Sequence, residues 1–571
     1  MIFANNYIVY IININMDSEL DIEQGAKLKR AFSLQDAALF GVGGAVGSGI
    51  LFAAAGGTAY AGPAILLSWI IASIMIVIVT LPFAEFSSMA PRGGISARIA
   101  YYSYGNFGGF MSGWSLFLWA VLIPPIEAVA VSQYASYYLP ALYDSNTKFL
   151  TIYGILLSIG LTILFVLLNV FGVRVFGKFN TGLTWLKVAS VVAIIIIVPL
   201  IVFNPANFST PSFILPVTKL SPYGAAGIVI AIPASGILFS FGGYRQVADM
   251  AGEIKNPKRN LPIAIGITLI VQSVFYVLMS IVTVGAVNWK GSNITTGNWG
   301  AISSLGSPLA TILNGSLSSV TGSSHLVLQI VIVLILVFAI FAPMGTFGVY
   351  LTGSSRIIFG FTRENSLPKV LGQTDKRGVP IFAIILVAVI GDLFLLPLPN
   401  WYSLVDFVVS AAAVNFAIVA SSIPVMRRLY PDKERSYKVP AFQIWSPIAF
   451  ISATLLIYWS TWPTVLYAMG AELTGIVVFL IFGVLINGKG TYHFKNGIWM
   501  PFYVIGMIIL SYIGSAYTGG LNILQYPMDF IVVVIYGVAF YFISLLSAPK
   551  KEVNDFTGLI ERAPKEMEQE A

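Results

Sequence analysis

Two ionisable side chains stand out because they lie well inside long apolar runs of the sequence. Lys187 is the only lysine well inside such a run, in TGLTWLKVASVVAIIII, and Glu127 follows two prolines in LIPPIEAVAVSQ. Charged groups at membrane depth are costly and usually serve transport or proton transfer. Because a buried amine can release its proton, we expect Lys187 to take part in proton coupling. Glu127 could pair with a cation, relay a proton or be a protonated structural carboxyl.

Lys187 also has a simpler explanation. It lies about seven residues, roughly 10 Å at helical rise, from the end of its apolar run. A lysine side chain at that depth can reach part of the way to the interface. A side chain that extends to the membrane surface is therefore the alternative to a functional lysine.

A glycine-rich stretch interrupts the first apolar run. Residues 41–50 read GVGGAVGSGI, with five glycines. Glycine inside a helix costs about 1 kcal/mol relative to alanine, so we expect the helix to break here. The new helix start would present free N–H groups and the positive end of a dipole, which suit a carboxylate. We expect the ligand groups at Gly47, Ser48, Gly49 and Ile50, with close helix packing as the alternative.

A second run, AIPASGILFSFGGYRQ at 231–246, contains one proline and three glycines. We expect its helix to break as well, which would free the carbonyls of Phe239, Ser240 and Phe241 to accept from an ammonium group. Broken backbone at membrane depth occurs only where it lines a cavity or is buried in protein. Interrupted segments at matching places in two halves are the best sequence indication of an inverted-repeat transporter and its binding site.

The composition excludes several classes of protein. Of 571 residues, 57% are hydrophobic and 10% charged, with a mean hydropathy of +0.85, whereas soluble domains carry about 25% charged residues. The absence of cysteine excludes disulfides, thiolate metal sites and cysteine nucleophiles. The sequence has neither an H-E-x-x-H motif nor a Walker A motif, which argues against an intramembrane enzyme and an ATP-driven pump. It has no repeated filter sequence typical of a channel, and we expect no cofactor and no metal.

Fourteen apolar runs are long enough to cross a lipid bilayer. They lie near residues 34–60, 63–89, 108–139, 149–170, 181–203, 224–246, 261–287, 326–356, 380–397, 402–425, 445–461, 464–487, 499–517 and 527–547. With the N-terminus inside, only Lys148, Lys219 and Lys290 fall in outside loops. The positive-inside rule then predicts two cytoplasmic termini in the plasma membrane. This topology explains the net charge of +7 without a nucleic-acid partner.

The chain divides by composition into five parts. We expect a cytoplasmic N-terminal tail (1–33), a first five-helix repeat (34–203), a second five-helix repeat (204–425), additional membrane helices (426–547) and a cytoplasmic C-terminal tail (548–571). Residues 1–15 lack the basic start and cleavage site of a signal peptide. We expect translation to start at Met16.

Four motifs resemble those of the amino acid–polyamine–organocation (APC) transporters. GVGGAVGSGIL resembles their first-helix motif and FAEFSSMAPRGG their second helix and following loop. FSFGGYRQVADMAGEIKNPKRNLPIAI is similar to their sixth helix and the loop pattern E-x-x-N-P-x-x-x-x-P, and GSSRIIFGFTRENSLPKVL to the end of their eighth helix. The resemblance covers roughly residues 33–445, and its most specific part is the loop at 253–262.

The resemblance implies an all-α polytopic fold, the LeuT-type 5+5 inverted repeat with broken helices 1 and 6. It implies secondary transport of amino acids, coupled to protons or by sodium-independent exchange. Phe239 stands where the family has an aromatic gate over the substrate, and Lys187 where related folds bind sodium. Some exchangers carry an acid where this chain has Arg245, so a mechanism that depends on that acid does not carry over.

The sequence says less about which side chain the substrate carries. Few acids line the expected cavity, which favours neutral or apolar amino acids, while Glu127 keeps cationic amino acids and polyamines as the alternative. Symport, exchange and oligomeric state stay open. Near the expected cytoplasmic face, gating or loop salt bridges are expected from Glu85, Arg92, Glu253 and Arg259.

Overall fold

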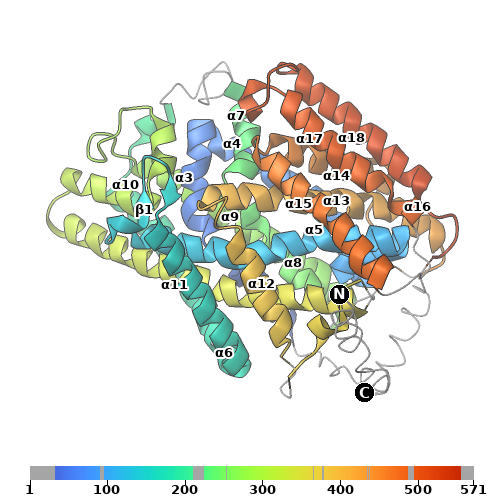
Figure 1. The fold of residues 1–571 in the computed structure, drawn as a ribbon. Coiled ribbons are helices and arrows are strands. Elements are labelled where there is room, and N and C mark those ends of the chain that lie inside the picture. The colour runs from blue at the N-terminus through green and yellow to red at the C-terminus, as the bar shows by residue number, and fades with distance from the viewer. Residues whose placement is uncertain are drawn as a thin grey trace, which may run out of the picture.

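The computed structural model is a bundle of helices (Figure 1). It describes residues 32–89, 95–209, 224–251, 254–363, 366–375, 379–433, 435, 437–486 and 494–553. The α-helices are α2 (Leu34–Ala45), α3 (Gly49–Ala61), α4 (Ile65–Met89), α5 (Ile95–Ala135), α6 (Ile152–Ile201), α7 (Gly224–Ala234), α8 (Gly243–Asp249), α9 (Pro257–Ala286), α10 (Pro308–Ser316), α11 (Gly322–Arg363), α12 (Ile381–Leu393), α13 (Trp401–Leu429), α14 (Phe442–Trp459), α15 (Thr464–Val478), α16 (Phe494–Gly497), α17 (Trp499–Ile513) and α18 (Met528–Ser547).

Short elements connect these helices. They include the 3₁₀ helix η5 (Phe239–Phe241), the π-helical stretch η10 (Phe479–Ile486) and a hairpin of β1 (Tyr143–Asp144) with β2 (Phe149–Leu150). The hairpin is antiparallel, with Tyr143 opposite Leu150. The predicted start at Met16 and both predicted tails lie wholly or mostly outside the described residues.

Ten helices of the described part are long and apolar enough to cross a membrane, or eleven if the bent pair Gly224–Ala234 and Phe239–Ala248 counts as one span. The chain is therefore a multi-pass membrane protein. Two predicted spans, 149–170 and 380–397, coincide with apolar helices of fewer than 18 residues, Ile152–Leu168 and Ile381–Leu393. The number fourteen and the 5+5 repeat stay predictions.

Helix α6 joins two predicted spans without a break. It has 50 residues, which corresponds to about 75 Å at helical rise. That length is more than twice the ~30 Å hydrocarbon core of a bilayer, so only parts of α6 lie at membrane depth. At its start, the Thr151 side chain accepts a hydrogen bond from the N–H of Gly154 at 3.4 Å.

Helix α5 lies in the middle of the bundle and packs along α11 and α13 (Figure 1). Its apolar window is wholly buried, whereas α18 leaves most of its window exposed, as helices that face lipid do. The backbone of α5 leaves helical geometry at Gly105, with φ 78° and ψ −170°, and Pro124 and Pro125 lie in its second half. This central position brings Glu127 into the interior.

Capping side chains fix the starts of two helices. Ser33 Oγ accepts from the N–H of Asp36 at 3.2 Å, and Asp36 Oδ2 accepts from the N–H of Ser33 at 2.9 Å, which is the reciprocal capping box. At the start of α13, Asn400 Oδ1 accepts from the N–H of Tyr402 at 2.8 Å. The cap places Trp401, the first residue of α13, with its side chain fully buried.

Both predicted helix interruptions are confirmed. Helix α2 ends at Ala45 and α3 begins at Gly49, so the glycine-rich stretch contains the break. Helix α7 ends at Ala234, and the segment that starts at Phe239 is bent from it by 46°. Gly236 lies in this second break with φ +80°, a conformation that side chains rarely adopt and that glycine adopts without strain.

Candidate functional site

The two helix breaks lie against each other. A Cβ atom added at Gly49, the first residue of α3, would lie only 2.6 Å from Ser240 Oγ in η5. A Cβ at Gly243, the first residue of α8, would lie 2.2 Å from the carbonyl oxygen of Gly41. Glycine is therefore required for the close approach of the two broken segments. The backbone groups predicted to bind the substrate carboxylate lie next to those predicted to bind its ammonium group.

Helix α5 carries Glu127 to the first break. Its Oε2 accepts a hydrogen bond from the backbone N–H of Ser48 at 3.1 Å. Its Oε1 has no hydrogen-bond partner among the described residues and would lie 2.8 Å from a Cβ at Gly47. A protein carboxylate thus occupies one of the N–H donors that the sequence assigns to a carboxylate ligand.

The next donors along α3 are free. In the described part of the chain, no group accepts from the N–H of Gly49 or Ile50. The first N–H groups of a helix have no acceptor within the helix and point along its axis. The start of α3 therefore combines one occupied donor at Ser48 with two open ones.

Lys187 points into the protein from α6. Its Nζ donates to the carbonyl oxygen of Gly43 and to Thr346 Oγ1, both at 3.3 Å, and the residue is only 1% exposed. An ammonium at the C-terminal end of α2 is also favoured by the helix dipole. The alternative of a lysine that extends to the membrane surface is wrong, because these contacts direct the amine to the break.

A small cavity lies between the breaks and α5. It is lined by Gly44, Ala45, Trp119, Ile123, Glu127, Phe239, Gly242, Thr346 and Tyr350. It has room for roughly one water molecule, so a larger ligand requires the surrounding helices to move apart. Its lining joins the first break, the second break, α5 and α11.

Aromatic side chains cover one side of this cavity. The Phe239 ring lies 5.9 Å from the Trp119 ring and 5.8 Å from the Trp401 ring, centroid to centroid. Trp401 Nε1 donates to Ser48 Oγ at 2.8 Å, and its ring stacks on Phe52 at 4.8 Å. The predicted gate residue Phe239 therefore packs among aromatic rings that also hold the first break.

The remaining predicted residues of the second break point elsewhere. Ser240 Oγ donates to the carbonyl oxygen of Gly236 at 2.8 Å. The Phe241 ring packs against Trp69 and Tyr276, at 5.8 and 6.2 Å, and does not line the cavity. Only the backbone carbonyl of Phe241 remains as a candidate ligand group at that position.

Of the nine residues that line the cavity, sequence reasoning named only Glu127 and Phe239 as site residues; those that it missed include Trp119, Thr346 and Tyr350. Trp119 had a usable signal, because it lies two helical turns before Glu127 and faces the same way at i, i+4, i+8 spacing. Thr346 and Tyr350 lie in an apolar helix far along the chain, and no local pattern connects them to the breaks. Within the described ranges, no three histidine, aspartate or glutamate side chains form a metal site.

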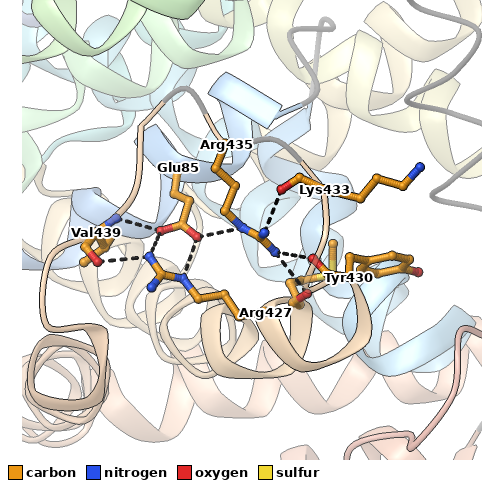
Figure 2. A network of polar contacts seen from close by, with 7 residues as sticks. Glu85, Arg427, Tyr430, Lys433, Arg435 and Val439 are labelled. Carbon is orange, nitrogen blue, oxygen red and sulfur yellow. Dashed lines mark hydrogen bonds and ion pairs between the residues drawn. The ribbon is translucent and has the colours of Figure 1, made fainter.

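A network of charges joins the ends of α4 and α13 (Figure 2). The Glu85 carboxylate accepts from Arg427 Nε at 2.9 Å and Nη2 at 2.6 Å, and from the N–H of Val439 at 2.8 Å. Arg435 Nε lies 3.3 Å from the same carboxylate. Burial lowers the pKa of Arg435, and the charge of Glu85 opposes that shift. The predicted salt bridge of Glu85 is confirmed, while Arg92 and Glu253 lie outside the described residues.

Comparison with known proteins gives consistent results. Residues 32–486 match the amino acid permease family. The chain is 30% identical to the glutamate/serine transporter AimA of Bacillus subtilis, over 90% of this chain and 93% of that protein. It is 29% identical to the aspartate-proton symporter of the same bacterium, over 92% and 98%. It is 26% identical to the aromatic amino acid transport protein AroP of Escherichia coli, over 76% and 91%.

Proposed function

Since the chain belongs to the amino acid permease family, we propose that it is a secondary active transporter that moves amino acids across the plasma membrane by alternating access. It is a transporter and not an enzyme, because its family is one of permeases and its relatives are transporters. The two broken segments form the substrate site, with both termini in the cytoplasm. The predicted repeats at 34–203 and 204–425 are the two halves that rearrange around it.

The observation that carries this proposal is the hydrogen bond between Ser48 and Glu127. A carboxylate already lies at the start of α3, and an amino acid brings another one. The substrate carboxylate binds the N–H groups of Gly49 and Ile50, with Gly47 allowing a close approach and the hydroxyl of Ser48 donating a further bond. Free N–H groups at a helix start are a general site for anions.

The ammonium group of the substrate binds the second break. Carbonyl groups of Phe239, Ser240 and Phe241 are the acceptors, because the chain there leaves regular α-helix. The Phe239 ring covers the bound amino acid as a gate. Its contacts with Trp119 and Trp401 support this role, since a shift of either ring changes access to the cavity.

Protons drive the transport through Glu127 and Lys187. An ionised Glu127 next to a substrate carboxylate is unfavourable, because two like charges repel strongly where little water screens them. Glu127 therefore takes up a proton when substrate binds and releases it on the other side. Lys187 donates to the Gly43 carbonyl and Thr346, where its positive charge replaces a sodium ion. One relative is named an aspartate-proton symporter, which supports symport; exchange is the alternative.

The substrate class is narrowed by charge. Glu127 was the reason to consider cationic amino acids and polyamines, but one oxygen of its carboxylate already accepts from Ser48. The expectation of neutral or apolar substrates depended on the scarcity of acids around the cavity. That scarcity disfavours cations and is equally compatible with neutral and acidic amino acids.

The experiment is uptake of labelled amino acids into proteoliposomes under three conditions. These are an inward proton gradient, an inward sodium gradient, and internal amino acid alone. Accumulation driven by the proton gradient supports the proposal. Strict dependence on sodium contradicts the role of Lys187 and leaves amino acid transport standing. Uptake only against internal amino acid makes the protein an exchanger, and failure of folded protein to transport any amino acid contradicts the proposal.

A further inference from the structure

Arg245 is a buried cation in the described part of the chain without a hydrogen-bonded acid. It lies in α8 and is 3% exposed, and neither Nη1 nor Nη2 has a hydrogen-bond partner among the described residues. Its guanidinium carbon lies 4.9 Å from the Trp119 ring centre and 5.3 Å from that of Phe416. Cation–π contacts recover part of the cost of burying a charge, but they leave the N–H donors of Nη1 and Nη2 unused.

The guanidinium of Arg245 stacks on a residue that lines the cavity, although Arg245 itself is not among the lining residues. Trp119, on which it stacks, lines the cavity together with Ile123 and Glu127 on the same face of α5. These residues span eight positions, or about 12 Å along the helix axis. One end of the cavity is therefore at Glu127 and the start of α3, and the other end is at Trp119, on which Arg245 stacks.

A second unpaired polar group lies next to Gly44, one of the residues that line the cavity. A Cβ added at Gly44, which lines the cavity, would clash with Gln246 Oε1. Neither Oε1 nor Nε2 of Gln246 has a hydrogen-bond partner within the described ranges, and the residue is 7% exposed. Buried polar side chains are normally hydrogen-bonded, and unpaired ones require an explanation. Arg245 and Gln246 together provide N–H donors that have no acceptor among the described residues.

We infer that Arg245 binds the side-chain carboxylate of the substrate, and that the transported substrates are acidic amino acids. The inference rests on the proposed function, in which the α-carboxylate lies at the other end of the cavity. Guanidinium binds carboxylate in a bidentate manner that a lysine does not match. Because Arg245 does not line the cavity in this structure, the Trp119 ring turns aside when substrate binds, and Gln246 supplies a further donor.

This assignment explains the charge balance of the site. A cationic substrate would be repelled by Arg245, and a neutral one would leave the guanidinium buried and unpaired. Leaving a buried charge without its partner is strongly destabilising. Under this inference, aspartate and glutamate are the preferred substrates in place of the neutral or apolar amino acids that the sequence analysis expects.

The test compares pairs of substrates of equal size in proteoliposomes, namely L-glutamate with L-glutamine and L-aspartate with L-asparagine. The measured quantity is the ratio of kcat/KM within each pair. We expect the wild type to prefer the acid, and Arg245→Gln to lower the ratio by about a hundredfold or more, because the site then lacks the charge that the acid requires. Arg428→Gln, which removes an exposed arginine at the end of α13, is the matched control and leaves the ratio unchanged.

Each outcome is decisive. A wild-type preference for glutamine over glutamate overturns the inference and leaves amino acid transport intact, whether or not any variant folds. Equal loss of both members of a pair in Arg245→Gln gives Arg245 a structural role and also overturns it. Arg245→Lys, which keeps the charge but loses the fork of donors, is expected to recover part of the ratio. Transport of no amino acid by the wild type would instead contradict the proposed function.

Discussion

The backbone N–H of Ser48 donates to the carboxylate of Glu127 at 3.1 Å, although 79 residues separate the two in the chain. A helix start is usually capped by the side chain of its N-cap residue, which accepts from an N–H of the first turn. Ser48, the N-cap residue of α3, makes no such side-chain cap, and Glu127 from α5 accepts from the N–H of Ser48 itself. The protein thus holds its own carboxylate next to the N–H groups that we propose for the substrate carboxylate, and this proposal links occupation of the site to the charge of Glu127.

Replacement of Glu127 by glutamine tests this link. The amide oxygen of glutamine still accepts from Ser48, so the shape of the break is kept, but the side chain no longer titrates. We expect accumulation driven by a proton gradient to fall by an order of magnitude or more, equivalent to about 1.4 kcal/mol or more of lost coupling. Exchange of labelled for unlabelled amino acid, measured as counterflow, is expected to persist.

Glu472→Gln is the matched control for that variant. Glu472 is a second fully buried carboxyl, in α15, and its Oε2 accepts from Ser115 Oγ at 2.9 Å, but it does not line the cavity. We expect its replacement to leave proton-driven accumulation unchanged. Equal loss of accumulation in both variants would mean that any buried carboxyl is needed for folding, and would contradict a specific role of Glu127.

Lys187→Met removes the charge next to the first break and keeps the length of the side chain. The carbonyl of Gly43 and the hydroxyl of Thr346 then lose their donor. We expect proton-driven uptake to fall at least about tenfold. Lys187→Arg, which stays protonated at all relevant pH values, is expected to lose proton-driven accumulation too. Full accumulation by Lys187→Arg would show that only the positive charge matters and not the exchange of a proton.

Much of this site follows from local sequence, and the rest does not. The breaks at Gly47 and Gly236 follow from glycine content, because backbone conformation is a local property. The depth of Lys187 and Glu127 in apolar runs also identifies them as candidate functional residues. By contrast, Trp401 meets Ser48 across 353 residues, and such pairings depend on how the helices pack. No periodicity in one helix predicts which distant helix supplies its partner.

Helix α6 differs from the prediction, because the sequence analysis expects two separate spans and the structure has one continuous helix. The sequence places two spans at 149–170 and 181–203, with a polar connection between them. The structure continues the helix through that connection, although the connection contains Gly172, Gly177 and Asn180, which are poor helix formers. Hydropathy indicates where a chain lies relative to the bilayer, and it does not indicate where a helix stops.

Gly47→Ala is expected to impair transport. The new methyl group would lie 2.8 Å from Glu127 Oε1 and 2.9 Å from Thr346 Oγ1, so both side chains must move away from the break. We expect substrate uptake to fall on the order of tenfold. Gly266→Ala in α9 is the matched control, because no heavy atom lies within 4 Å of the added Cβ. It should transport normally and gain about 0.5–1 kcal/mol of helix stability; similar losses in both variants would contradict the explanation.

Trp401→Phe separates the indole N–H from the aromatic ring. Phenylalanine can keep the stacking on Phe52 but cannot donate to Ser48 Oγ. One neutral hydrogen bond contributes about 1 kcal/mol, so we expect KM for the substrate to rise about fivefold while kcat changes little. Trp401→Leu, which loses both the ring and the donor, should be impaired further. An unchanged KM in Trp401→Phe would mean that the orientation of the Ser48 hydroxyl does not matter for binding.

Glu85→Gln is expected to lower the stability of the whole protein and to leave its substrate specificity unchanged. Glu85 is 1% exposed and is the carboxylate that both Arg427 and Arg435 approach in the network at the ends of α4 and α13 (Figure 2). Removal of one partner from a buried ion pair leaves the other charge uncompensated and costs about 3–5 kcal/mol. The partial exposure of Arg427 lowers that cost, so we expect a loss of about 2–3 kcal/mol. A melting temperature several degrees below that of the wild type, measured in detergent, would show this loss of stability.

Lys438→Gln is the control for this variant, because it removes a charge at an exposed residue of the same connection and should leave the melting temperature unchanged. An unaltered melting temperature in Glu85→Gln, with altered uptake kinetics, would instead make this network a gate that opens during transport.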